Sequence, residues 1–175
     1  MKRDFLKLLA ELDEDELREE LKALYERFPV LREYYKMELS GNTRKLLEKY
    51  KAALRKTFFT GRRRMGRRAR SNSAKVLKDF KEISIHAKDV IELQFFRVAV
   101  MIEAMEHYSV DNEQFCKSVL SSFVQVAKLA QKELMLDTFK LTAQAIVDAW
   151  DGPDYYSDSN LQDVFDQYWG AVEDM

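Results

Sequence analysis

The segment from Ala87 to Tyr108 constrains the fold most, because it is apolar on nearly every side of a helix. A helix on a protein surface keeps its apolar residues to one stripe, whereas a helix that is covered on several sides does not. The apolar residues here are Val90, Ile91, Leu93, Phe95, Phe96, Val98, Val100, Met101, Ile102 and Met105. We therefore expect this helix to be central, with Leu93, Phe96, Val100 and Met101 buried by helices from both halves of the chain.

The other segments show the 3.6-residue periodicity of amphipathic helices, and none alternates as a β-strand does. Further helices are expected at about 13–28, 29–39, 42–59, 73–83, 112–130, 136–150 and 159–172. Asp13 and Glu16 fit a capping box at the first of these, and Ser71, Asn72 and Ser73 are candidate N-caps for the fourth. The sequence predicts an all-α fold, a single-domain array of antiparallel helix pairs around the central helix, either an irregular bundle or a short solenoid-like stack.

Length and composition favour one helical domain over residues 1–175, with an arginine-rich connection at about 60–71. Hydrophobic residues make up 46% of the chain, which is enough for a core and too much for a disordered protein. The single cysteine, Cys116, excludes a disulfide within the chain and favours a reducing compartment. The N-terminus is charged from its second residue, and no apolar run approaches the roughly 20 residues of a membrane span. We therefore expect a cytoplasmic protein without a membrane segment.

Basic residues are concentrated in the middle of the chain. Residues 49–78 contain twelve Lys or Arg and no acid, and six of these are arginines between Arg62 and Arg70. A planar guanidinium donates paired hydrogen bonds to phosphate. The candidate polyanion-binding residues are Arg55, Lys56, Arg62, Arg63, Arg64, Arg67, Arg68 and Arg70. Two other interpretations stay open: this segment is a solvated loop, or it pairs with the region from Leu141 onward, which holds eight acids and no base.

Arg97 is a candidate buried charge, because it lies inside the central apolar segment. Its neighbours one helical turn away, Leu93, Gln94, Val100 and Met101, include no acid. A charge that is buried requires a partner. That partner is either an anionic ligand in an internal pocket or an acid from another helix, unless the side chain reaches the surface along its stem.

No constellation of side chains indicates a metal, a cofactor or a catalytic residue. Glu103 and His107 have the i, i+4 spacing of a ligand pair, but a di-iron bundle needs Glu-x-x-His on two helices, and the only other histidine is His86. Cys116 lies on an apolar stripe and is interpreted as a packed core thiol. Residues 151–160 cluster oxygen ligands without the residue order of a calcium loop.

Three segments carry a resemblance to a known family: ELREELKALYERFPVLREYY, KLLEKYKAALRKTFF and SAKVLKDFKEI, in this order. Through them, and over most of its length, the chain resembles an uncharacterised bacterial family, a domain of unknown function. The resemblance implies an all-helical bacterial protein of the cytoplasm and supplies no activity, cofactor or catalytic residue. Members of the family often have a proline after the paired phenylalanines, where this chain has Thr60, and a shorter basic link.

These observations favour a non-enzymatic protein–protein interaction or scaffold module with an unidentified protein partner. The alternative is sequence-independent binding of RNA, DNA or another polyanion through residues 49–78. An enzyme ranks third, because the sequence contains no recognisable nucleophile–base pair, phosphate-binding loop or metal set. A scaffold predicts an exposed apolar or tyrosine-rich groove, a nucleic-acid binder predicts arginines free of acids, and an enzyme predicts a closed pocket around Arg97.

Overall fold

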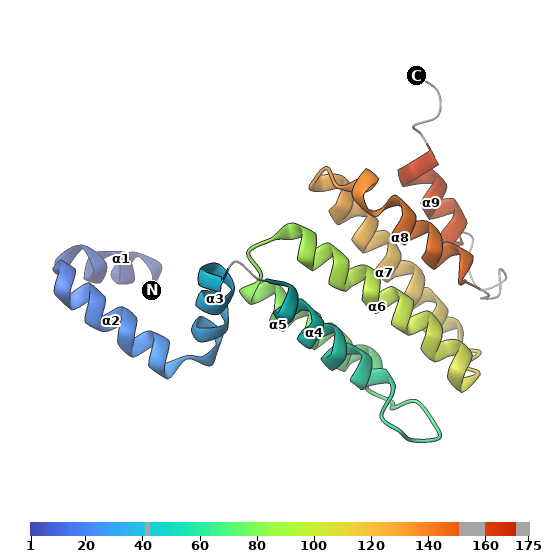
Figure 1. Ribbon diagram of the computed structural model, residues 1–175, viewed down its shortest axis with the longest axis horizontal. Helices are drawn as coiled ribbons and strands as arrows, with labels where there is room; N and C mark the ends of the chain where they lie inside the picture. The colour runs from blue at the N-terminus through green and yellow to red at the C-terminus, as the bar shows by residue number, and fades with distance from the viewer. Residues whose placement is uncertain (41–42, 151–159, 171–175) are drawn as a thin grey trace.

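The computed structural model describes residues 1–40, 43–150 and 160–170, and these contain nine α-helices and no strand (Figure 1). Helix accounts for 83% of the described residues, far above the usual third, so the all-α prediction is confirmed. The helices are α1 (Lys2–Glu11), α2 (Glu14–Arg27), α3 (Pro29–Ser40), α4 (Thr43–Phe58), α5 (Ala69–Ile83), α6 (Ala87–Tyr108), α7 (Glu113–Lys132), α8 (Leu136–Asp148) and α9 (Leu161–Trp169). The periodicity of the sequence did not predict α1. None of the described helices is both long enough and apolar enough to span a membrane.

Helix α6 is the centre of the fold, as its apolar sequence predicts. It packs against α4, α5, α7 and α8, and in Figure 1 it lies between the α4–α5 pair and the helices that follow it. Leu93, Val100 and Met101 are buried, as expected. The prediction is wrong for Phe96, which is only half-buried, because its ring lies at the side of α6 that α4 and α8 leave open.

The C-terminal helices close the core around one tryptophan. Trp169 of α9 is buried, and its indole Nε1 donates a hydrogen bond of 2.8 Å to the carbonyl oxygen of Leu136. Its ring packs on those of Phe165, Phe95 and Phe123, with centroid separations of 5.3, 6.3 and 6.1 Å. Because Phe95 belongs to α6 and Phe123 to α7, this cluster ties the last helix to the centre of the bundle.

Helices α1, α2 and α3 form an arm that extends away from the bundle of α4 to α9 (Figure 1). Helix α2 packs on α3, and α3 contacts α4 and α5. The capping box predicted for α2 is present: Glu16 N donates to Asp13 Oδ1, and Asp13 N donates to Glu16 Oε2. Yet neither α1 nor α2 has a buried residue. The apolar side chains that the arm exposes include Phe5, Leu6, Leu8, Leu21, Tyr25 and Phe28.

Residues 59–68, which we call the arginine link, connect α4 to α5. Gly61 in this link has a φ of +73°, a left-handed conformation that favours glycine. The serine caps predicted for the next helix are wrong, because α5 begins at Ala69 and no side chain caps it. Ser73 lies inside the helix instead, where its hydroxyl donates to the carbonyl oxygen of Arg70.

Candidate protein-binding groove and basic surfaces

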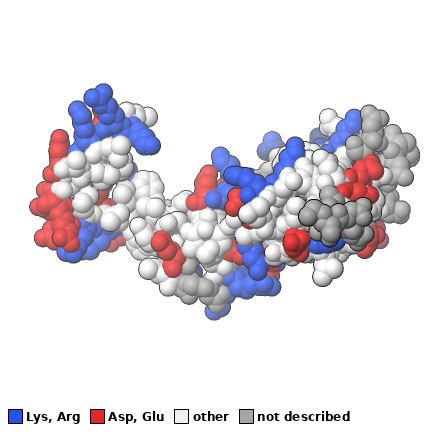
Figure 2. Space-filling view, turned by 90° about the horizontal axis from the view of Figure 1, so that it is seen from above, with Lys and Arg blue, Asp and Glu red and all other residues white. Residues whose placement is uncertain are grey.

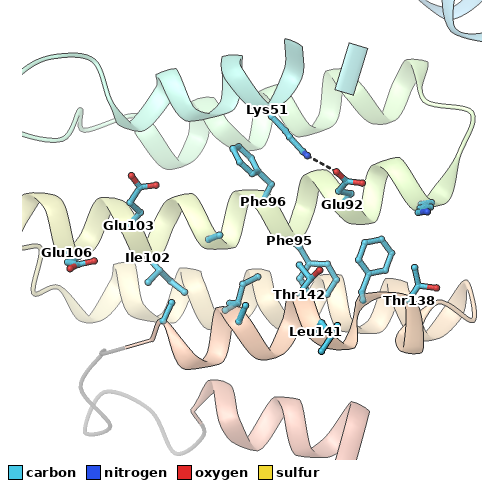
Figure 3. Close-up of a pocket in the computed structure, with 16 residues that line it drawn as sticks. Lys51, Glu92, Phe95, Phe96, Ile102, Glu103, Glu106, Thr138, Leu141 and Thr142 are labelled. Atoms are coloured by element: carbon cyan, nitrogen blue, oxygen red, sulfur yellow. Dashed lines mark hydrogen bonds and ion pairs between the residues drawn. The ribbon is translucent and has the colours of Figure 1, made fainter. Parts of the chain in front are cut away.

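A groove of about 770 Å³ runs along α6 between α4 and α8 (Figure 3). Its lining is Lys51, Lys88, Glu92, Phe95, Phe96, Ala99, Ile102, Glu103, Glu106, Thr138, Phe139, Leu141, Thr142, Ala145, Ile146 and Ala149. The floor is apolar, with Phe96 and Ile102 of α6 labelled in the close-up. On the α8 side, the side chain of Leu141 is 86% exposed. The molecule therefore presents an open apolar channel rather than a closed cavity.

Helical spacing explains why the channel forms. On α6, residues 92, 96, 99, 103 and 106 recur every three or four positions and share one face of the helix. Leu141 and Ala145 of α8, and Ala149 just after it, recur every four positions beside the buried residues Phe139, Ala143 and Ile146. The sequence pattern predicted no position for this groove. The second apolar stripe on α8 was the available signal.

Two ion pairs join α4 to α6 along one edge of the groove. Lys51 Nζ lies 2.6 Å from Glu92 Oε1 and 3.1 Å from Glu48 Oε1. Arg55 donates from Nη1 and Nη2 to the two carboxylate oxygens of Glu103. This hydrogen-bonded pair lowers the pKa of Glu103, and the positive charge of Arg55 lowers it further. The charged edge is thus fixed by interactions inside the chain, whereas the apolar floor stays open.

The arginine link carries the least compensated positive charge in the described part of the chain. Its five arginines are exposed, and none forms an ion pair or a side-chain hydrogen bond with another described residue. These residues are Arg62, Arg63, Arg64, Arg67 and Arg68. Lys56 on α4 is likewise exposed and without an ion pair in the described ranges. Six of the eight candidate polyanion-binding residues are therefore accessible to an external anion.

The other two candidates have partners within the chain. Arg55 is held by Glu103, and its guanidinium carbon lies 4.7 Å from the centre of the Phe59 ring. Arg70 Nη1 donates to the carbonyl oxygen of Gln114 at 3.0 Å and to Ser118 Oγ at 2.7 Å. Polyanion binding by this surface stays a prediction. Five of the eight acids after residue 140, at positions 151, 154, 158, 173 and 174, lie outside the described residues, and so does nearly all of the oxygen-rich cluster at 151–160.

Arg97 reaches from α6 towards both α5 and α7. Its Nε donates to Ser73 Oγ at 2.9 Å, and its Nη1 donates to Ser122 Oγ at 2.8 Å. The side chain is half-buried, and this burial lowers its pKa. No Asp or Glu among the described residues forms an ion pair with it. Of the three alternatives for Arg97, an acid from another helix is thus not found among the described residues, where the two hydroxyls are its partners.

The remaining candidates from the sequence, Glu103, His107 and Cys116, make contacts that stabilise the fold. Glu103 is bound by Arg55, and the His107 ring packs edge-on against Phe59 and Tyr108. Within the described ranges, no group of three or more His, Cys, Asp or Glu side chains is placed to hold a metal ion. Cys116 is buried, as interpreted from its apolar stripe, and burial raises the pKa of its thiol.

Comparison with known proteins gives one finding. Neither the curated proteins nor the solved structures contain a match to this chain. A family model does match residues 1–168, and its description is a family of unknown function, DUF6155. The match spans the arm, the arginine link and the helices that form the groove, and it confirms the resemblance to an uncharacterised family. The chain belongs to the family of unknown function DUF6155.

Proposed function

We propose that the chain is a non-enzymatic protein–protein interaction module whose groove binds a short amphipathic helix. The observation that carries this proposal is the apolar floor of the groove, which α4 and α8 leave open, with Leu141 86% exposed at its side. Contiguous exposed apolar surface flanked by charged residues is typical of interaction sites. Helices that bind in such grooves insert side chains spaced by three or four residues.

The dimensions of the groove suit a helix. Its lining extends along α6 from Lys88 to Glu106, a length of about 27 Å at a rise of about 1.5 Å per residue. A guest helix of ten residues is about 15 Å long by the same measure, so it fits with room for side chains at both ends. The groove therefore accommodates two to three turns of helix along its apolar floor.

The chain itself carries a helix with the required properties, α1. Phe5, Leu6 and Leu8 of α1 are exposed, and no residue of this ten-residue helix is buried. A helix of this length is marginal in water unless it packs on another surface. The arm projects away from the bundle, and in Figure 2 its outer part, at the left, joins the rest of the molecule through a narrower region. We infer that α1 occupies the groove of a second copy of the chain.

Charge at the two ends of the groove supports one orientation of α1. Lys2 and Arg3 lie at the start of the helix, and Glu11 is its last residue. In the groove, Glu106 lies at one end of the α6 lining and Lys88 at the other. Neither of these two forms an ion pair with another described residue. With Lys2 and Arg3 towards Glu106, and Glu11 towards Lys88, each end of α1 faces a residue of opposite charge at that end of the groove.

Light scattering coupled to gel filtration, over a series of protein concentrations, tests this proposal. The unchanged protein is expected to form dimers or larger assemblies as its concentration rises. Ala99→Arg in the groove and Leu8→Arg on α1 should each reduce this association. Ala53→Arg, at an exposed alanine of α4 outside the groove lining, is the matched control and should associate normally.

A charge reversal sharpens the test. Glu106→Lys should weaken association, and combining it with Lys2→Glu and Arg3→Glu should restore it, because the charges are then exchanged between the two surfaces. A protein that stays monomeric at every concentration contradicts the proposal. So does an Ala99→Arg variant that associates as well as the Ala53→Arg control.

The exposed arginine link favours a second candidate function, sequence-independent binding of RNA or DNA. Fluorescence anisotropy with mixed-sequence oligonucleotides should then show an affinity that falls with salt, with a log–log slope of about −0.7 to −0.9 per phosphate neutralised. Changing Arg62, Arg63, Arg64, Arg67 and Arg68 to Ala should abolish binding. Changing Arg3, Arg18, Arg27, Arg32 and Arg44 to Ala removes the same charge elsewhere and should not. Absence of binding at low salt rules this function out.

A further inference from the structure

The guanidinium of Arg97 is held in a fixed orientation by two serines from neighbouring helices. Ser73 on α5 accepts from Nε, and Ser122 on α7 accepts from Nη1. Each serine hydroxyl in turn donates to a carbonyl oxygen of its own helix, Ser73 Oγ to Arg70 O at 2.8 Å and Ser122 Oγ to Ser118 O at 2.6 Å. The hydroxyls therefore position the guanidinium but bring no negative charge to it.

The remaining donors of Arg97 have no acceptor in the described part of the chain. The serines use two of its five N–H groups, at Nε and Nη1, which leaves one N–H of Nη1 and both N–H groups of Nη2. One N–H from each of Nη1 and Nη2 can bind a carboxylate or a phosphate through two parallel hydrogen bonds. Burial lowers the pKa of Arg97, but arginine remains protonated in proteins. A half-buried charge without a counter-charge is unusual, because charges inside proteins are normally paired.

The side chains around Arg97 add donors and positive charge. Lys81 of α5 is exposed, and its pKa is lowered first by desolvation and then by the nearby positive charge of Arg97. Gln94 precedes Arg97 by one turn on the same face of α6, is only 6% exposed, and has a buried Nε2 with no acceptor among the described residues. Arg70 donates to Ser118, one turn from Ser122 on α7. Thus none of these described neighbours supplies a negatively charged acceptor to Arg97.

We propose that Arg97, Lys81 and Gln94 form a binding site for a phosphate-type oxyanion on the face of the bundle where α5, α6 and α7 meet. Two oxygens of the anion accept from the Nη1–Nη2 edge of Arg97, and the other oxygens face Lys81 and Gln94. A tetrahedral anion fits this set better than a planar carboxylate, because the donors come from two different helices. The site is separate from the groove, whose lining contains none of these three residues.

Thermal unfolding of the full chain in phosphate and in chloride, at equal pH and ionic strength, tests the site. A ligand that binds only the folded state raises Tm as its concentration increases. Phosphate should therefore raise Tm and chloride should not. Lys81→Ala should shrink the shift, whereas Lys78→Ala, at an exposed lysine of the same helix, should leave it unchanged. Arg97→Lys keeps the charge but loses the paired hydrogen bonds, so it should weaken the affinity about tenfold or more.

Titration calorimetry with inorganic phosphate and with a nucleoside monophosphate identifies the source of the ligand. Tighter binding of inorganic phosphate supports a site for the free ion, and tighter binding of the ester supports a phosphate group on a larger molecule. If neither ligand binds and phosphate leaves Tm unchanged, the site does not exist. If Lys81→Ala and Lys78→Ala weaken binding equally, the anion is attracted by overall charge and the assignment to Arg97 is wrong.

Discussion

Replacing Leu93 with Ala should destabilise the bundle by about 2–5 kcal/mol. Leu93 is fully buried, with 0% of its side chain exposed, on the helix that contacts four others. The change removes three carbon atoms, which is worth roughly 2.4 kcal/mol at about 0.8 kcal/mol per methylene. A cavity that the neighbours do not refill adds about 24 cal/mol for each Å³. Since α6 is packed on several sides, complete refilling is not expected.

The matched control is Leu21→Ala on α2, because Leu21 is 54% exposed and α2 has no buried residue. The same chemical change there should alter stability by no more than about 0.5 kcal/mol. Urea unfolding followed by tryptophan fluorescence is the appropriate measurement, since Trp169 belongs to the bundle core, Trp150 packs against it, and the arm contains no tryptophan. A loss below about 1 kcal/mol for Leu93→Ala, or equal losses for the two leucines, would show that α6 is not the centre of the core.

Two substitutions and one labelling reaction test further features of the fold. Leu134 follows α7 with a φ of +57° and is 93% exposed, so Leu134→Gly should raise the free energy of unfolding by up to about 1 kcal/mol while Leu134→Ala does not. Glu103→Gln should reduce stability at neutral pH by at most about 1 kcal/mol, because the pair with Arg55 is exposed. Because Arg55 lowers the folded-state pKa of Glu103, this contribution is present above about pH 4.3 and is lost as pH falls through the folded pKa, so the difference in urea unfolding between variant and unchanged protein should shrink as the pH falls below that value. Cys116 should react with iodoacetamide much faster in urea than in the folded protein, as followed by mass spectrometry, because burial raises the pKa of its thiol and blocks access.

Local signals in the sequence predicted the helices well and their surroundings less well. The capping box at Asp13 and the apolar repeat that follows it correctly indicated α2. That repeat identifies which side of a helix can be buried, but it contains no information on what covers that side. In this chain no other described element covers α2 enough to bury a residue. The same limit explains Phe96, whose apolar character predicted burial although α4 and α8 leave its ring half-exposed.

Contacts between residues that are far apart along the chain could not be predicted from the sequence. Arg97 stood out because it interrupts an apolar segment, but its partners Ser73 and Ser122 lie 24 and 25 residues away on two other helices. Serine is common and has no periodic signature, so nothing marked these two in advance. Ser73 was instead interpreted as a helix cap, since serine is strongly preferred at the N-terminal cap of a helix. Its hydroxyl serves the arginine, and α5 begins four residues earlier.

The order in which the helices pack has a consequence for how the chain folds. In the bundle, α4 packs on α5, α5 on α6, α6 on α7, and α8 on α9, so most partners are neighbours along the sequence. Contacts between neighbouring segments close short loops, so the chain loses little conformational entropy before the stabilising contacts form. This is the low contact order of helical proteins that fold within microseconds to milliseconds. During synthesis, α4, α5 and α6 can pair before α8 and α9 have been made, and the late helices then complete a core that is already partly assembled.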